Sequence, residues 1–338
     1  MVRAGPGWRS PQVATDLLSP LLRTLLARLG TRAGRPRLAI LMFHQVLERP
    51  SALFPGIPDV ETFRWQMTLV SRLFHVLPLA EAVGALRRGS LPPRALAISF
   101  DDGYRNNLTQ ALPVLQSLGL PATFFVATGF LDGQVMWNDR VIAALSSTRR
   151  VEFDSGLPGI DRLILDSPGA RRRAIERILA AIKYLPPAQR LEVVADIEQR
   201  AGCRADRGLM LDPAGVRALA AAGMEIGAHT RTHPILTALD PAAAEREIRR
   251  GREELETLLG RPVRLFAYPN GRPGRDYGPE HVAMVRRAGF LAAVSTAPGA
   301  AEPATDLFQL PRFTPWDRTA LRFGLRMARN YLTPVVSI

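Results

Sequence analysis

The sequence contains one cysteine and one lysine among 338 residues. With Cys203 alone, no disulfide can form within the chain, and a zinc site built from cysteines is excluded. Because Lys183 is the only lysine, arginine carries nearly all the positive charge in a net charge of +13. Such a charge favours acidic partners such as anionic lipid, nucleic acid or an acidic polymer. We expect no nucleic-acid binding, because no compact basic run with interleaved aromatic residues is present.

Long apolar runs are also missing. No stretch is long enough to span a bilayer. Arg23 and Arg28 interrupt the leucine-rich N-terminal segment at the place where a signal peptide would need an apolar core. We therefore expect no secretion signal, and we predict a protein that is cytoplasmic or peripheral at the cytoplasmic face of the membrane.

The two ends of the chain have a basic, amphipathic character. Residues 1–35 predict an amphipathic extension, because six leucines fall on one helical face: Leu18, Leu21, Leu22, Leu25, Leu26 and Leu29. Such a helix can lie on a membrane surface or pack against its own domain, and we favour packing. Residues 317–338 form a C-terminal tail of similar character. Together the two ends are a candidate membrane-facing patch.

Between these ends, residues 36–316 alternate strand-like and helix-like segments. About seven to eight strands in this pattern are typical of a parallel (β/α) barrel or of a doubly wound sheet. Polar residues recur where the strands finish: His44, Asp101, Asp102, Thr128, His229, Asn270 and Arg312. We favour the barrel, because barrel enzymes build their active sites at that end of the strands. Residues 130–211 interrupt the alternation and predict a mostly helical insertion.

Two adjacent carboxylates follow the apolar strand predicted at 95–100. Asp101 and Asp102 have no spacer between them, and Gly103 permits a sharp turn. Neighbouring side chains on an extended backbone point in opposite directions. The two acids can therefore do different work, one binding a metal and the other moving a proton, although a capped turn would use the same residue types.

Two histidines four residues apart follow another predicted strand. His229 and His233 can face the same side of one helical turn, and the chain has five histidines in all. With Asp102 they offer one oxygen and two nitrogen ligands. Zinc sites with three protein ligands keep a fourth position for water, and this is the catalytic kind. The same ligand set also serves non-haem Fe(II), so counting ligands leaves the metal open.

At these residues the chain resembles the polysaccharide deacetylases with the NodB-homology fold, carbohydrate esterase family 4. Phe100-Asp101-Asp102-Gly103 is similar to the family's first motif and His229-Thr-Arg-Thr-His233 to its second. The resemblance covers 36–316 and implies a distorted (β/α) barrel. It implies Asp101 as the catalytic base. It also implies a divalent metal, most often Zn²⁺, on Asp102, His229 and His233.

The segment Phe266-Ala-Tyr-Pro-Asn270-Gly resembles a third motif, found in one branch of the family. There, a backbone N–H near Asn270 faces the developing oxyanion. The usual arginine of this motif is replaced by Ala267, and Arg264 is out of register, so the resemblance does not identify what orients Asp101. The late histidine motif is missing. A branch with permuted motifs carries this histidine on the first strand, which implies His44 as the general acid.

The resemblance implies removal of N-acetyl groups from a sugar or polysaccharide during synthesis or modification of a surface polysaccharide. We predict glycan contacts from Trp137, Trp316, Tyr268 and Arg312, although the tryptophans can equally be core residues. Without a secretion signal, a lipid-linked or cytoplasmic glycan precursor fits best. Two alternatives stay open, namely another amide or cyclic imide hydrolase on the same fold and a catalytically silent carbohydrate-binding protein.

Overall fold

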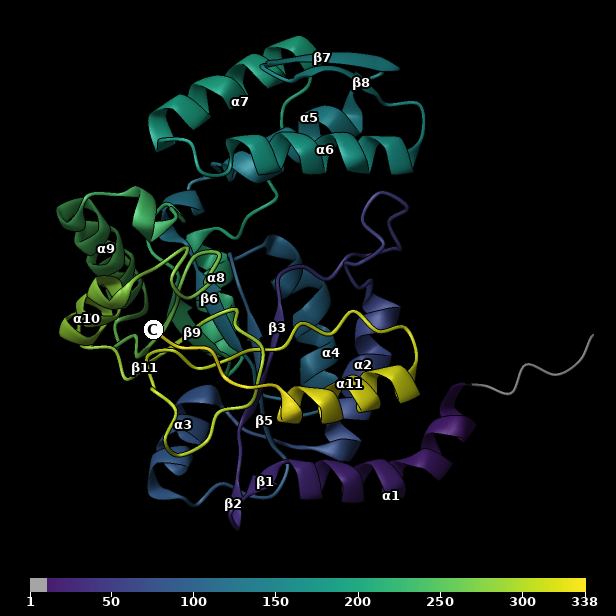
Figure 1. The fold of residues 1–338 in the computed structure, drawn as a ribbon, viewed down its shortest axis with the longest axis vertical. Helices are drawn as coiled ribbons and strands as arrows, with labels where there is room; N and C mark the ends of the chain where they lie inside the picture. Colours follow the sequence, from purple (N-terminus) through teal and green to yellow (C-terminus); the bar gives the residue numbers. More distant parts are fainter. Residues whose placement is uncertain (1–10) are drawn as a thin grey trace, which may run out of the picture.

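The computed structural model describes residues 11–338, with side chains from residue 20 onward except at residue 161. At the centre of this part lies a seven-stranded parallel sheet, shown in Figure 1. Its strands are β3 (Ala39–Phe43), β4 (His75–Val76), β5 (Ala95–Phe100), β6 (Thr123–Val126), β9 (Glu225–Ala228), β10 (Leu265–Ala267) and β11 (Ala292–Val294). Neighbouring strands follow the order β11-β10-β9-β6-β5-β3, and β4 pairs with the start of β5.

The sheet curls until its two edges approach the same segment. Residues 308–313 bridge to β11 through Leu310 and Val294, and to β3 through Phe313 and Leu41. The predicted strand at 308–313 is therefore present as two isolated bridges and not as a continuous ladder. The expected distorted (β/α) barrel is confirmed, with this segment completing the wall between β11 and β3.

Helices connect most of the strands, and most of them cover the outside of the sheet. They are α2 (Val60–Leu73), α3 (Leu79–Arg88), α4 (Leu112–Ser117), α8 (Pro213–Ala221), α9 (Pro241–Leu259) and α10 (Pro279–Arg287). Asp212 and Asp240 accept N-terminal backbone N–H groups of α8 and α9, each followed by proline at the first helical position. Gly260 ends α9 in the left-handed conformation. A π-helical segment, Asn107–Ala111, precedes α4 and its Pro113.

Alternation along the strands divides the buried side chains into two groups. Leu96, Ile98 and Phe100 of β5 pack with the outer helices. Ala95 and Ala97 face the barrel interior, where α3 also contributes apolar side chains. The same alternation directs Asp101 inward, because it follows outward-facing Phe100. The strand pattern therefore decides which of the two acids faces the inside of the barrel.

Aromatic residues fix the register of three strands just before the polar rim. Phe43 and Phe100 are paired across β3 and β5, and their ring centroids lie 5.3 Å apart. Phe124 of β6 stacks on Phe100 at 4.7 Å. Burying a Phe side chain contributes about 1.5–3 kcal/mol. A slip by one residue would turn these rings to the wrong face, so this row aligns His44 with Asp101.

The insertion within 130–211 folds around its own apolar core. Its elements are α5 (Trp137–Ser147), β7 (Glu152–Leu157), β8 (Ile160–Ile164), α6 (Pro168–Ile182) and α7 (Pro187–Ala201). Figure 1 shows it as a separate layer beyond one end of the barrel. The expectation of a mostly helical insertion omitted the antiparallel hairpin β7–β8. The sequence signal for this hairpin is the turn dipeptide Pro158-Gly159, which lies between two short segments in which apolar and polar residues alternate.

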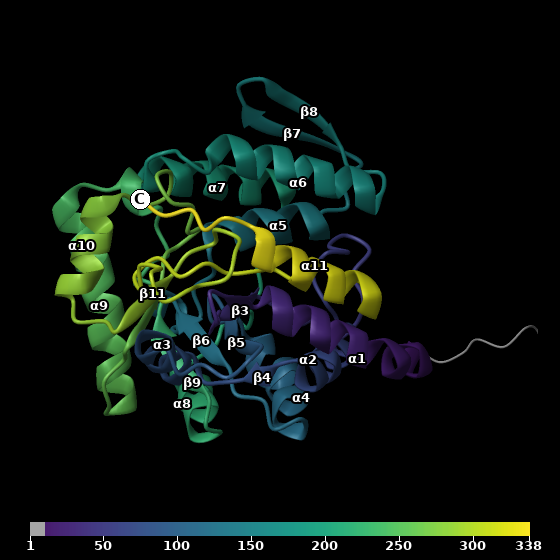
Figure 2. The same ribbon diagram turned by 60° about the horizontal axis from the view of Figure 1, so that its bottom comes forward.

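The terminal segments pack together on the barrel. Helix α1 (Pro11–Leu29) leads into the short antiparallel pair β1 (Thr31–Arg32) and β2 (Arg35–Pro36), and α11 (Ala320–Leu332) follows the barrel. Figure 2 shows α1 and α11 side by side. Leu22 and Leu26 are buried, which agrees with the packing that we favoured for the extension. Its residues 1–10 lie outside the described residues. No helix in the described range has the length and apolarity needed to cross a membrane.

Candidate metal centre and active site

Asp101 and Asp102 lie at the carboxyl end of β5 and contact different partners. The Asp101 N–H donates to the Phe43 carbonyl at 2.9 Å, which extends the β3–β5 pairing by one residue. Asp102 has a φ of 79° and Gly103 a φ of 84°, so the chain turns sharply directly after Asp101. Both carboxylates are buried. The sequence prediction that the two acids serve different purposes fits this geometry.

Asp102, His229 and His233 form a cluster that can hold a metal ion. One Asp102 oxygen lies 3.4 Å from His229 Nε2 and 3.3 Å from His233 Nε2. All three ligand atoms lie within 4.8 Å of one another. Ligands at about 2.0–2.1 Å from a tetrahedral zinc ion are separated by about 3.3 Å. The spacing between the carboxylate and both imidazoles therefore matches the size of such a site.

The hydrogen bonding of this cluster also calls for a cation. His229 Nδ1 lies 2.7 Å from the Ala267 carbonyl, so Nδ1 carries a proton and donates it. In the neutral imidazole, Nε2 is then unprotonated, and its lone pair points at an Asp102 oxygen. That oxygen, Oδ1, is buried and accepts no hydrogen bond from the described residues. A metal ion satisfies both lone pairs at once, and the residues present fit one.

Electrostatics in the cluster favour the deprotonated forms of Asp102 and His233 at neutral pH. Burial opposes ionisation of Asp102, but the charges of the neighbouring histidines outweigh it and hold the pKa of Asp102 well below its usual range. Burial lowers the pKa of His233 to about 4. Asp102 raises the pKa of His229 against the opposing effect of burial. An ionised carboxylate beside a neutral His233 is the state required for binding a metal.

Helix α9 positions the loop that carries the two histidines. A Glu247 carboxylate oxygen accepts the backbone N–H groups of Arg231 at 3.0 Å and Thr232 at 2.7 Å. Gly251 packs so closely that an added Cβ would lie 2.5 Å from the Thr230 carbonyl oxygen. Sequence reasoning did not identify Glu247 or Gly251, since neither belongs to a recognisable motif.

Strained backbone is concentrated at this site. Four non-glycine residues on its loops have positive φ values between 54° and 79°: Asp102, Thr230, His233 and Asn270. Such conformations cost of order 1–3 kcal/mol each and persist only where surrounding contacts impose them. The hydrogen bond from the His233 N–H to Thr230 Oγ1, at 3.1 Å, is one such contact. The fold therefore holds these residues in a set geometry before any ligand arrives.

Arg312, on the segment that completes the wall between β11 and β3, holds Asp101. Its two terminal nitrogens lie 2.6 and 2.7 Å from the two carboxylate oxygens. The same guanidinium donates to Ser99 Oγ at 3.2 Å and to the Ser295 carbonyl at 2.8 Å. Burial opposes ionisation of Asp101, but Arg312 outweighs it, and the pKa of Asp101 is lowered. Arg312 thus occupies the role that the sequence left without a residue.

His44 lies on the same rim as the two aspartates. It follows β3 directly, is exposed, and contributes to the field acting on Asp101, Asp102 and His233. The buried Asn107 side chain donates to the His44 carbonyl at 2.7 Å and fixes its backbone. The prediction that placed His44 at the active end of the barrel agrees with this position.

Asn270 lies on the loop after β10, beside the loop after β11. Its carbonyl accepts the Thr296 hydroxyl at 2.8 Å. Its backbone N–H makes no hydrogen bond with the described residues. A left-handed residue with a free N–H is suited to receive an anionic oxygen. The predicted oxyanion contact is therefore compatible with this backbone.

Two of the predicted glycan contacts are corrected by burial. Tyr268 is 0% exposed and stacks on Tyr277 at 3.9 Å between ring centroids. Arg312 is fully buried as well, with its donors directed at Asp101, Ser99 and Ser295. Neither side chain can reach a sugar in this structure. Both lie at the ends of predicted strands, and periodicity alone does not distinguish a core side chain from one on the rim.

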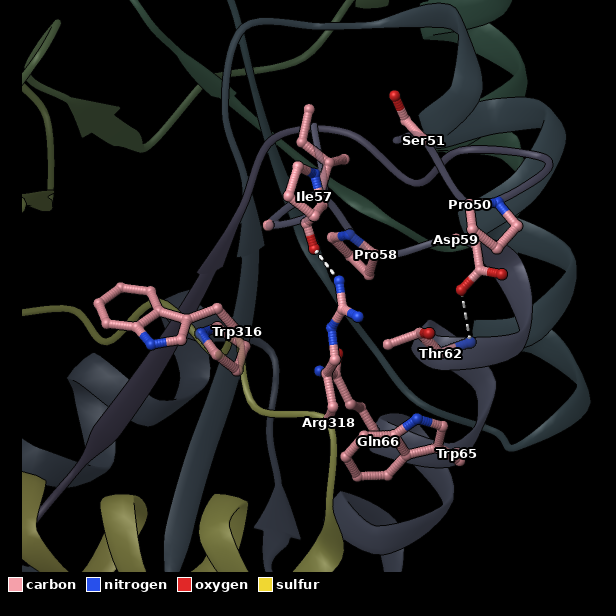
Figure 3. A pocket seen from close by; sticks show the side chains of 13 residues that line it. Pro50, Ser51, Ile57, Pro58, Asp59, Thr62, Trp65, Gln66, Trp316 and Arg318 are labelled. Atoms are coloured by element: carbon pink, nitrogen blue, oxygen red, sulfur yellow. Dashed lines mark hydrogen bonds between the residues drawn. The ribbon is translucent and has the colours of Figure 1, made fainter. Parts of the chain in front are cut away.

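The two tryptophans predicted as glycan contacts lie in different surroundings. Trp137 packs against the core of the insertion, with the Arg190 guanidinium 4.7 Å from its ring centroid. Trp316 is 60% exposed and lines two cavities, neither of which includes Trp137. Figure 3 shows Trp316 at one of them, of about 180 Å³, where Arg318 donates to the Pro55 carbonyl. Of the predicted aromatic contacts, Trp316 alone is well exposed.

A buried polar pair joins the insertion to the rim of the barrel beside the metal ligands. The Tyr104 hydroxyl donates to Asp139 of α5 at 2.9 Å. Burial, together with the charge of Asp102, raises the pKa of Asp139 to about 7. Sequence reasoning grouped Asp139 with Trp137 in the insertion but assigned it no role. Its proximity to Asp102 depends on how the insertion docks, which local patterns do not reveal.

Comparison with known proteins supports the resemblance seen in the sequence. The polysaccharide deacetylase family model matches residues 88–293. YxkH of Bacillus subtilis strain 168, a provisionally named polysaccharide deacetylase, is 22% identical over 277 residues, which cover 82% of this chain and 70% of that protein. These matches confirm the family predicted from the motifs.

Solved structures share the fold. The deacetylase PplD of Streptococcus pyogenes, solved with acetate, has a TM-score of 0.60 at 18% identity and covers 87% of this chain and 99% of its own. IcaB from Ammonifex degensii has a TM-score of 0.55 at 18% identity, with coverages of 86% and 97%. At this identity the likeness establishes the barrel fold alone. With the family match over more than half its length, the chain belongs to the polysaccharide deacetylase family, whose members hydrolyse carbon–nitrogen bonds other than peptide bonds.

Proposed function

We propose that this protein is a metal-dependent deacetylase that removes acetyl groups from N-acetylated sugars of a surface or exported polysaccharide. One observation carries the proposal. The Asp102, His229 and His233 cluster lies at the mouth of the barrel, and a second carboxylate, Asp101, is held beside it by Arg312. A binding module has no need for an ionised base beside a set of metal ligands.

We assign Zn²⁺ to the cluster, because one carboxylate and two imidazoles with an open fourth position are typical of catalytic zinc. When bound, such an ion lowers the pKa of a coordinated water and polarises the amide carbonyl. The chain supplies the proton transfers. Asp101 accepts the proton of the attacking water, since Arg312 uses one lone pair of each carboxylate oxygen and leaves another open. Arg312 keeps this base ionised and oriented.

The remaining groups act on the oxyanion and the leaving amine. The Asn270 N–H donates a hydrogen bond to the oxygen that becomes negative in the tetrahedral intermediate. His44, in its protonated form, donates a proton to the nitrogen as the carbon–nitrogen bond breaks. The products are acetate and a free amino sugar. Trp316 offers an exposed ring on which a sugar can stack beside the site.

Acetate release from N-acetylglucosamine oligomers, measured together with the metal content, tests this assignment. Asp101→Asn is expected to lower activity at least a hundredfold and to keep the metal, because the base is lost while the ligands remain. His229→Ala is expected to lose both. Chelation is expected to abolish activity in the wild type, and added Zn²⁺ is expected to restore it.

Matched controls separate the site from general damage to the fold. Asp132→Asn and His75→Ala change the same residue types at exposed positions away from the cluster and are expected to retain activity and metal. A wild type that hydrolyses simple amides but no acetylated sugar would overturn the assigned substrate. Full activity in Asp101→Asn would overturn the assigned base.

A further inference from the structure

Helices α1 and α11 pack as a parallel pair with a close interface. A Cβ added at Gly324 of α11 would lie 2.9 Å from the Leu22 side chain of α1. One added at Gly30, just after α1, would lie 3.1 Å from the Tyr331 ring of α11. The early contact and the late contact occur in the same order along both helices. The two helices therefore run in the same direction, with Leu22 facing Gly324.

This arrangement places two rows of exposed leucines on one side of the pair. With about 100° per residue, Leu21 and Leu25 lie about 60–100° from Leu22 in one rotational sense. By the same count, Leu321, Leu325 and Leu332 lie about 60–100° from Gly324 in the opposite sense. In parallel helices, opposite rotations from facing residues lead to the same side. These five leucines, between 37% and 71% exposed, form what we call the leucine face.

Arginines flank the leucine face, and no acid lies on it. By the same angular count, Arg28 borders it on α1, while Arg322 and Arg329 border it on α11, and all three are exposed. Neither α11 nor residues 20–29 contain an Asp or Glu. The pattern of apolar centre and basic edges on a helix surface is that of segments lying in the interface of an anionic bilayer.

We propose that the leucine face docks this protein on the surface of an anionic lipid bilayer. The chemistry favours lipid over other occupants. A second copy would bring the arginine edges of both molecules together without any acid to offset them. Protruding leucines on a convex helix pair need matching holes in a protein partner, whereas acyl chains adapt to them.

A cavity beside the leucine face borders the residue that positions the base. This cavity of about 480 Å³ is lined by Arg329 at the edge of the leucine face, by Trp316, and by Arg312, which holds Asp101. The cavity thus extends from the docking helix to Arg312, the residue that holds the base.

Vesicle flotation of the full chain tests the proposal. We expect the wild type to float with vesicles of phosphatidylglycerol and phosphatidylcholine, to bind pure phosphatidylcholine at least tenfold more weakly, and to be released by salt. The double variant Arg28→Gln/Arg322→Gln is expected to bind roughly fivefold more weakly for each arginine removed. Leu321→Ser/Leu325→Ser is expected to lose about tenfold.

Control variants that remove the same residue types elsewhere on the surface test whether loss of vesicle binding is specific to the leucine face. Arg246→Gln/Arg250→Gln on α9 removes the same charge, and Leu191→Ser on α7 removes an equally exposed leucine; both are expected to bind as the wild type. Circular dichroism and the thermal midpoint verify folding of every variant. Equal loss of binding in the α9 control, absence of flotation of the wild type, or a dimer in gel filtration that the leucine variants convert to monomer would overturn the proposal. Since flotation needs no activity, failure here leaves the proposed deacetylase untouched.

Discussion

At the scale of single residues, the site depends on side chains that satisfy one another across large sequence separations. Asp101 and Arg312 are 211 residues apart and meet as a buried bidentate pair. Removing one partner of such a pair costs about 3–5 kcal/mol because the other charge stays buried. Arg312 is therefore a positioning residue for the base and a structural residue for the barrel.

We predict that Arg312→Lys lowers kcat at least tenfold while the metal content stays unchanged. Lysine cannot reproduce the two parallel hydrogen bonds of a guanidinium. Because Arg312 lowers the pKa of Asp101, a weaker partner lets that pKa rise. The base then stays protonated up to a higher pH, so the acidic limb of the pH profile of kcat moves to higher pH.

Arg264→Lys is the control for this substitution. Arg264 lies near the third motif, and none of its contacts reaches Asp101 among the described residues. We expect an unchanged pH profile. A profile in Arg312→Lys that matches the wild type would show that Arg312 does not act on the base.

At the scale of elements, the geometry of the metal ligands is set by a helix that contributes no ligand. Helix α9 holds the His229–His233 loop through Glu247 and through the close approach of Gly251. Thr128, after β6, also bonds to Glu254 of the same helix. The loop is therefore held from the helix side, while Asp102 reaches it from β5.

We predict that Gly251→Ala weakens Zn²⁺ binding at least tenfold. The added methyl group would overlap the backbone of Thr230, between the two histidine ligands, and must displace the loop. Such displacement of supporting structure typically costs 10- to 100-fold in metal affinity. Competition with a chromogenic chelator measures the change.

Gly169→Ala on α6 is the matched control, because its added Cβ would contact only the flexible end of Arg173, at 3.6 Å. This variant is expected to bind Zn²⁺ as the wild type and to gain slight helix stability. Unchanged affinity in Gly251→Ala would show that the loop tolerates movement.

At the scale of the whole molecule, the insertion and the barrel meet through polar contacts, one of which is buried beside the site. Tyr104 of the barrel donates to Asp139 of the insertion, and Tyr184 of the insertion donates to Asp276 of the barrel at 3.1 Å. Contacts of this kind fix how the insertion lies over the rim. They also make its docking sensitive to protonation.

We predict that the chelated protein loses stability as the pH rises from about 4 to 7 through Asp139. Its pKa is about 7 in the folded state, well above the ordinary value of 3.8. Between these values the folded state binds a proton that the unfolded state has released, so unfolding becomes easier with rising pH, by up to about 1.4 kcal/mol per unit. Asp139→Asn removes this slope and keeps an acceptor for Tyr104.

Thermal midpoints across this pH range, recorded with chelator, measure the effect. Asp132→Asn, at an exposed position before α5, is expected to keep the wild-type slope. An identical slope in Asp139→Asn and the wild type would show that Asp139 does not govern the pH response of the junction.

Much of this molecule was already determined by local sequence. Apolar strands ending in polar residues indicated a barrel and placed His44, Asp101 and Asp102 on one rim. The His229–His233 spacing indicated the metal ligands, although the chain between them is an irregular loop with Thr230 and His233 in the left-handed region and not the helical turn that we expected. These predictions succeed because strand alternation, caps and ligand spacing act over a few residues, where the covalent chain itself imposes the geometry.

Only the tertiary structure decided the rest. It paired Asp101 with Arg312, buried Tyr268, separated Trp137 from Trp316, and aligned the leucines of α1 and α11 on one face. Each of these depends on how distant segments pack and on the rotation of one element about another. That information lies in the complementarity of surfaces far apart in the chain, which no local period encodes.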